Sequence, residues 1–172
     1  MTSVAPNVNG SLLRMTINVA ATHFEKDGNL QKTLAQIVPM PEAINVMSAF
    51  ANALIEEFGD RGIGRDRMTQ LLESGVAKLK GMYPFFQPVS IVDGRIDLSP
   101  LERAQAAPEE IVKAWSDLIS DLCDYAIEGL GEQASIPRYR KAGGAVFKKN
   151  KIIFQSMDLE SAIPSLDLPM GF

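Results

Sequence analysis

Residues that build catalytic and metal sites are scarce in this sequence. Its 172 residues include one histidine, His23, and one cysteine, Cys123. A single cysteine excludes an internal disulfide, and a Cys-His catalytic pair would need these two residues to meet. Zinc sites are built mainly from histidine and cysteine ligands. We therefore expect no metal, no cofactor and no nucleophilic centre.

Long apolar runs are also missing. No run approaches the roughly 20 residues that a membrane-spanning helix needs. The first ten residues, MTSVAPNVNG, lack the basic region and apolar run of a secretory signal. A lone thiol on a core face suits a reducing compartment. These features predict a cytoplasmic protein without a membrane span.

The clearest pattern present is an amphipathic helix over residues 108–131. Pro108 suits its first turn, and Gly131 offers an exit with positive φ. A stripe of carboxylates lies opposite the apolar face, and its i, i+4, i+7 spacing is typical of a solvated helix side rather than a cation site. The apolar face holds Ile111, Val112, Trp115, Leu118, Ile119, Leu122, Cys123, Ala126 and Leu130. We expect this helix to form the centre of the core.

Further helices are predicted at 41–58 and 65–80, with Gly75 inside an apolar stripe where another helix must pack closely. Asp93-Gly94 between two β-branched runs predicts a hairpin near 89–98. Residues 11–24 fit both a helical and a strand pattern, and we favour a helix. The expected fold is mainly α, a bundle of four to six helices with two short β-hairpins. The alternative is an α+β fold with one small antiparallel sheet.

The predicted organisation has four parts. Residues 1–10 read as a flexible N-terminal arm, and residues 11–131 as the helical domain. Residues 132–156 read as a basic β-hairpin that turns near Lys149-Asn150, because Pro137 and Gly143-Gly144 are expected to break a helix. Residues 157–172 form an apolar tail with too many prolines and glycines for a long helix.

Positive charge is concentrated in one segment. From residue 138 to residue 151 there are six basic side chains and no acidic one, while the rest of the chain carries a net charge of −10. Aromatic residues among these cations suit nucleic acid, but a sequence pI of about 5.1 argues against a polyanion partner. We therefore expect docking on protein, in cis or in trans. The basic candidates are Arg138, Arg140, Lys141, Lys148, Lys149 and Lys151.

The apolar tail supplies a second set of partner-binding candidates, Leu166, Leu168, Met170 and Phe172. Leaving such side chains in water is unfavourable by roughly 25 cal/mol per Å² of apolar surface. The tail either folds back on its own domain or enters a partner's groove in extended form. The sequence leaves both choices open.

A glycine- and arginine-rich loop precedes the helix at 65–80. Glycines that expose backbone N–H groups, together with arginines before a helix N-terminus, are ingredients of an anion site. The loop lacks the Gly-Lys-Ser/Thr ending of a P-loop, and helix–helix loops are often rich in glycine for conformational reasons. The candidate anion-binding residues are Arg61, Gly62, Gly64, Arg65 and Arg67.

These features favour a non-catalytic interaction or accessory subunit, which docks another protein subunit or a second copy through the basic segment and the tail. The alternative is a small-molecule sensor with a pocket between helices near Gly75, Phe85, Phe86 and Trp115 and the arginine loop as anion selector. A third hypothesis is an enzyme that uses dispersed carboxylates. We expect no enzyme.

Overall fold

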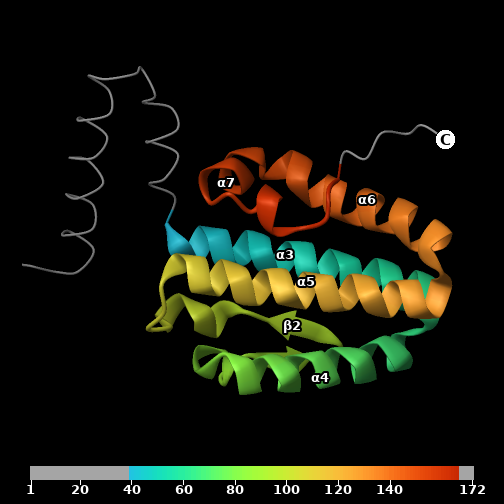
Figure 1. Ribbon diagram of the computed structural model, residues 1–172, viewed down its shortest axis with the longest axis horizontal. Helices are drawn as coiled ribbons and strands as arrows, with labels where there is room; N and C mark the ends of the chain where they lie inside the picture. The colour runs from blue at the N-terminus through green and yellow to red at the C-terminus, as the bar shows by residue number, and fades with distance from the viewer. Residues whose placement is uncertain (1–38, 167–172) are drawn as a thin grey trace, which may run out of the picture.

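The computed structural model describes residues 39–166. In that range the chain forms five α-helices, a two-stranded hairpin and several single turns of other helix types. Figure 1 shows α3 and α5 side by side in the middle, with α4 and the hairpin on one side and α6 and α7 on the other. The α-helices are α3 (Met40–Phe58), α4 (Arg65–Met82), α5 (Pro108–Leu130), α6 (Glu132–Lys149) and α7 (Lys151–Ser156).

The core lies where α3, α5 and α6 meet. Trp115 of α5 is fully buried and donates its indole N–H to the Met47 carbonyl of α3 at 3.0 Å. The Phe50 ring stands edge-on to Trp115 at 5.6 Å between centroids and also contacts Tyr139 and Phe154. Such aromatic pairs stabilise the fold beyond the contribution of the apolar area that they bury. The helix predicted at 108–131 is therefore present, and it is central.

The hairpin and α4 cover the opposite side of α3. Strands β1 (Ser90–Val92) and β2 (Arg95–Asp97) pair in antiparallel register around Asp93 and Gly94, which both have positive φ as the Asp-Gly signal requires. The Asn52 side chain on α3 accepts from the Ile96 N–H at 2.9 Å and donates to the Ile96 carbonyl at 3.0 Å. The hairpin is thus tied to α3 through its own backbone.

Gly75 lies in the apolar stripe of α4 and permits the close approach of α5 that this position predicts. A Cβ built at this position would lie 3.0 Å from the hydroxyl oxygen of Tyr125 on α5. Short connections complete this half of the fold: a single π-helical turn η1 (Gly59–Ile63) and the 3-10 turns η2 (Pro84–Phe86) and η3 (Ser99–Arg103).

The second β-hairpin, predicted for residues 132–156, is wrong. This segment forms α6 and α7, and the turn expected at Lys149-Asn150 is the junction between two helices. Gly143 does not break α6, because its missing side chain lets the helix approach Phe50 closely, and this packing outweighs a propensity loss of about 1 kcal/mol. Pro137 lies inside α6 on its exposed side.

The first part of the tail packs on its own domain. Leu159 and Ile163 are buried, and a third 3-10 turn, η4 (Glu160–Ala162), lies between them. The Ser116 hydroxyl donates to the Ala162 carbonyl, and the Tyr139 hydroxyl donates to the Pro164 carbonyl. Residues 159–166 are therefore an integral part of the helical body.

The prediction of a mainly α fold is confirmed, with one hairpin rather than two. The arm at 1–10, the ambiguous stretch at 11–24 and the last tail residues 167–172 lie outside the described residues. Between residues 39 and 166, no helix combines the length and apolar character needed to cross a bilayer.

Candidate protein-interaction face

The basic residues predicted to bind a partner lie along α6 and at the start of α7. Lys141, Lys148, Lys149 and Lys151 are exposed, whereas Arg138 and Arg140 are half-buried. The Nε of Arg140 is buried without a hydrogen-bond partner in the part of the chain that the structure describes. We refer to the exposed surface around Lys148, Lys149 and Lys151 as the basic face.

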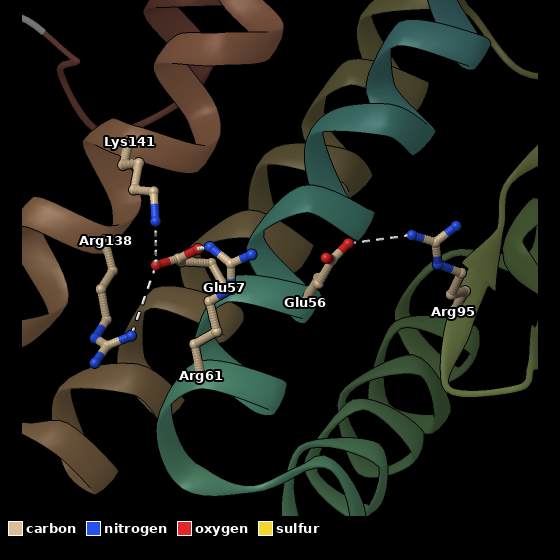
Figure 2. A network of polar contacts seen from close by, with 6 residues as sticks. All are labelled: Glu56, Glu57, Arg61, Arg95, Arg138 and Lys141. Carbon is tan, nitrogen blue, oxygen red and sulfur yellow. Dashed lines mark hydrogen bonds and ion pairs between the residues drawn. The ribbon is translucent and has the colours of Figure 1, made fainter.

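One end of this basic surface is neutralised by a carboxylate of the same chain. Glu57 of α3 has a side chain that is only 10% exposed, and Figure 2 shows three cations converging on it. Arg61 lies 3.4 Å away, Lys141 3.5 Å and Arg138 3.6 Å, measured between nitrogen and carboxylate oxygen. Glu57 therefore joins α6 to the end of α3, and part of the basic segment docks in cis.

The other end carries cations without an internal partner. Within residues 39–166, Lys148, Lys149 and Lys151 form no ion pair. Ile152 stands next to them in α7 and is 70% exposed. Single exposed apolar side chains are common on protein surfaces, so the unpaired lysines rather than Ile152 distinguish this face.

A groove separates α6 from α3 beside this face. It has a volume of about 400 Å³. Its apolar lining consists of alanines from both helices and Val146, and its polar lining is Glu56, Glu57, Arg61, Lys141, Lys149 and Asn150. The alanine side chains are too small to fill the space between the two helices. The groove is thus mixed in character, with carboxylates on its α3 side, and Lys141 on its α6 side is already paired with Glu57.

The apolar tail candidates divide into two groups. Leu166 is half-buried, and its Cδ2 lies 3.1 Å from the position a Cβ at residue 143 would take, so it packs on its own α6. Leu168, Met170 and Phe172 lie outside the described residues. The role of all four toward a partner stays a prediction.

The arginine loop does not gather its cations at one point. Arg61 contacts Glu57, and the Nε of Arg65 lies 3.4 Å from an Asp60 oxygen. The Gly62 backbone is packed against Leu130, since a Cβ there would lie 2.9 Å from a Leu130 methyl carbon. Of the five candidate residues, only Arg65 lines the neighbouring cleft of about 220 Å³, while Gly64 and Arg67 are exposed. Anion binding stays a prediction.

The pocket expected between helices is filled by side chains. Phe86 and Trp115 are fully buried, and Phe85 packs against Tyr83 with ring centroids 5.5 Å apart. Gly75 is covered by Tyr125, as described above. These residues are packed against one another within residues 39–166, and the sensor hypothesis stays a prediction.

Two carboxylates of the acidic stripe of α5, Asp117 and Asp121, face α4 and the residue that follows it. Asp121 accepts from Lys78 at 2.8 and 2.9 Å. Asp117 accepts from the Tyr83 hydroxyl at 2.6 Å, and Lys113 donates to the same hydroxyl at 3.2 Å. Among the described residues, no cluster of three or more histidine, cysteine or carboxylate groups could hold a metal ion.

Burial governs the chemistry of the single cysteine. The apolar surroundings of Cys123 raise the pKa of its thiol to about 12, and the nearby Asp124 carboxylate adds to the shift. Burial likewise raises the pKa of Tyr139. A thiol in such a site stays protonated and is a poor nucleophile.

Comparisons with protein-family models, curated proteins and solved structures found no match.

Sequence reasoning did not single out Glu57. Its position carried a signal nonetheless, because Phe50, Leu54 and Glu57 have the i, i+4, i+7 spacing of one helix face. A carboxylate on an apolar arc must be paired with cations to be buried. Two of the three cations, Arg138 and Lys141, come from the basic segment, and Arg61 comes from the turn after α3.

Proposed function

We propose that this chain is a non-catalytic interaction subunit that binds an acidic surface of another protein subunit through the basic face of α6 and α7. Residues Leu168, Met170 and Phe172 would add apolar contacts from the tail. The observation that carries the proposal is the set of three exposed lysines, Lys148, Lys149 and Lys151, with no ion pair inside residues 39–166.

Electrostatics supports a protein partner of opposite charge. Positive charge that is not neutralised in cis attracts acidic surfaces and speeds their association. The exposed Ile152 would supply an apolar contact that slows dissociation of the complex, because charges at the rim of an interface contribute little affinity. The groove beside α6 offers further apolar area within reach of the same lysines.

The test is affinity purification from the native host, with the tag at the N-terminus and the C-terminus left untagged. The variant Lys148→Glu/Lys149→Glu reverses two charges of the basic face. The control Lys80→Glu/Arg103→Glu makes the same change of charge on residues that form no ion pair in the described part of the chain. Lys148 and Lys149 both lie in the last turn of α6, whereas Lys80 lies in the last turn of α4 and Arg103 in η3, so circular dichroism and thermal unfolding check that both variants stay folded.

We expect a defined set of proteins to be retained by the wild type and the control but lost by the Lys148→Glu/Lys149→Glu variant. Raising the salt concentration should weaken retention, because exposed charges are screened beyond a Debye length of about 8 Å at physiological ionic strength. Equal retention by all three proteins would exclude the basic face as a binding site. Retention that disappears after nuclease treatment would point to nucleic acid instead.

A further inference from the structure

The groove between α3 and α6 has a charged half and an apolar half. Figure 1 shows that the two helices run in opposite directions, and the contact between Lys141 and Glu57 fixes which turns face each other. Each turn of α6 beyond Lys141 therefore lies opposite a turn of α3 before Glu57. The charged half is lined by Glu56, Glu57, Arg61 and Lys141. The apolar half offers room away from these charges and is lined by Ala49, Ala53, Ala145 and Val146.

The last described residues of the chain pack on α6 close to this groove. The Ser116 hydroxyl of α5 donates to the Ala162 carbonyl, so the chain comes along the α5 side of α6. The Leu166 Cδ2 then lies 3.1 Å from the position that a Cβ at Gly143 would take. Figure 1 shows the described chain ending beside α6. The residues after Leu166 therefore start on one side of α6, and the groove lies on the other.

Three consecutive residues of α6 mark a path from Leu166 to the groove. Successive helix residues are about 100° apart around the axis, so Gly143 contacts Leu166, Gly144 comes next around the helix and Ala145 lines the groove. A Cβ at Gly144 would meet nothing within 4 Å, and Ala145 is exposed. A chain that crosses α6 at this point meets no long side chain from these three positions.

Cations lie on both sides of this crossing point. Arg140 and Lys148 are each four residues from Gly144 and therefore lie on the same side of α6. Neither forms an ion pair within residues 39–166, and the Nε of Arg140 is buried there without a hydrogen-bond partner. Asp167 follows Leu166 directly in the sequence. A chain that crosses here brings the Asp167 carboxylate to two unpaired cations.

The residues after Leu166 are long enough to reach the groove. Half of the circumference of a helix about 10 Å in diameter is roughly 16 Å. An extended chain from Leu166 reaches about 14 Å at Met170 and about 20 Å at Phe172. Pro169 favours this extended form, because it fixes its own φ and restricts the residue before it to extended conformations. The apolar side chains at 170 and 172 are therefore the ones that arrive at the groove.

We infer that residues 167–172 cross α6 at Gly144 and place Met170 and Phe172 in the apolar half of the groove of the same molecule. The contact is autoinhibitory, because it covers the groove beside the basic face. This regulatory role rests on the proposed function: a partner that uses the groove has to displace the tail. The displaced Met170 and Phe172 are then free to contact that partner.

Disulfide trapping tests the contact in the full chain. The variant Ala145→Cys/Met170→Cys places one thiol in the groove and one in the tail, in a Cys123→Ala background that leaves no other thiol. The matched control is Ala77→Cys/Met170→Cys, since Ala77 is an exposed alanine of α4 and Figure 1 shows α4 and α6 on opposite sides of α3 and α5. Circular dichroism and thermal unfolding check that both variants are folded.

We expect the Ala145→Cys/Met170→Cys variant to form a disulfide of monomer mass in oxidised glutathione at low micromolar protein. Its rate should be about tenfold or more above the rate of the same variant in urea, a comparison that removes the effect of loop length. The control should close no faster folded than in urea. A disulfide-linked dimer, or a rate no higher than in urea, would overturn the inference.

Methyl resonances test the position of the Phe172 ring without cysteines. The ring should shift the Ala49, Ala53 and Ala145 methyl resonances upfield, and Phe172→Leu should move them back while it keeps an apolar side chain. The Ala77 methyl resonance should not change. Unchanged resonances at all three groove alanines would place the ring elsewhere and overturn the inference.

The affinity purification from the native host tests the regulatory role. The oxidised Ala145→Cys/Met170→Cys variant, with its tail locked, should retain at least fivefold less host protein than the same variant after reduction. Equal retention by the two forms would overturn autoinhibition. A wild type that retains no host protein would refute the proposed function and autoinhibition together, whereas the disulfide and the methyl resonances would still decide the contact of the tail with its own groove.

Discussion

Two neighbouring glycines in α6 should respond to the same substitution with opposite signs. Gly143 and Gly144 both lie inside the helix, and neither has positive φ. A Cβ at Gly143 would lie 2.9 Å from two ring carbons of Phe50 and 3.1 Å from a methyl carbon of Leu166, whereas a Cβ at Gly144 would meet nothing within 4 Å. The pair therefore separates packing from backbone propensity within one turn.

The magnitudes follow from these distances. Replacing glycine by alanine in a helix interior favours folding by roughly 0.5–1 kcal/mol, and Gly144→Ala should stabilise by about that amount. Gly143→Ala gains the same term but forces the Phe50 ring to move. That ring is fully buried against Trp115, and overpacking of this kind is unfavourable by typically 1–3 kcal/mol. Gly143→Ala should therefore be the less stable variant by about 1–3 kcal/mol.

Urea unfolding followed by the fluorescence of Trp115 measures both variants against the wild type. For a chain of this size, 1 kcal/mol corresponds to a melting-temperature shift of about 2–4 °C, so thermal unfolding should resolve the pair as well. Equal stability of the two variants would refute the close approach of α6 to α3. It would also remove the physical reason that this segment is a helix despite its glycines.

Three further predictions concern other contacts. Glu57→Gln should destabilise by about 1–2 kcal/mol, because Arg61, Arg138 and Lys141 lose the carboxylate that they share, and high salt should shrink the difference from wild type in urea unfolding. Asn52→Asp should destabilise by more than about 1 kcal/mol, because a carboxylate oxygen would replace the amide N–H donor that faces the Ile96 carbonyl. The rate of hydrogen exchange at the Ile96 amide should rise. The pKa of the Cys123 thiol is raised in the fold, so on raising the pH the unfolded chain loses the thiol proton first, near the ordinary pKa of 9.0. The free energy of unfolding should therefore fall as the pH rises from about 9 toward 12. The urea midpoints at pH 8 and pH 10 should differ less in Cys123→Ala than in the wild type.

Local signals were sufficient for the first half of the described fold. The Asp93-Gly94 turn needs positive φ at both residues, which few other residue pairs supply, so its hairpin could be read directly. The helix over residues 108–130 combines a proline in its first turn, a continuous apolar face and Gly131 at its end. Each of these features acts within a few residues of the element it determines.

The second half depended on contacts that the sequence does not display. The glycines at 143 and 144 indicate a break by propensity, and only the Phe50 ring, far away in sequence, gives Gly143 a reason to be helical. The cluster of basic residues was visible in the sequence, but its division into cations paired with Glu57 and cations left unpaired was not. Which cations meet Glu57 and which stay exposed depends on how α6 lies against α3.

The packing of residues 159–166 fixes the starting point of the six residues that follow. Leu166 is held at Gly143, so a fully extended chain from there to Phe172 reaches at most about 20 Å. Any surface that Leu168, Met170 or Phe172 touches must come within that radius of Gly143, and Lys148 and Lys149 lie only about 8–9 Å further along α6. A tether this short raises the effective concentration of the tail at a partner bound to α6, and the two contacts would then strengthen each other.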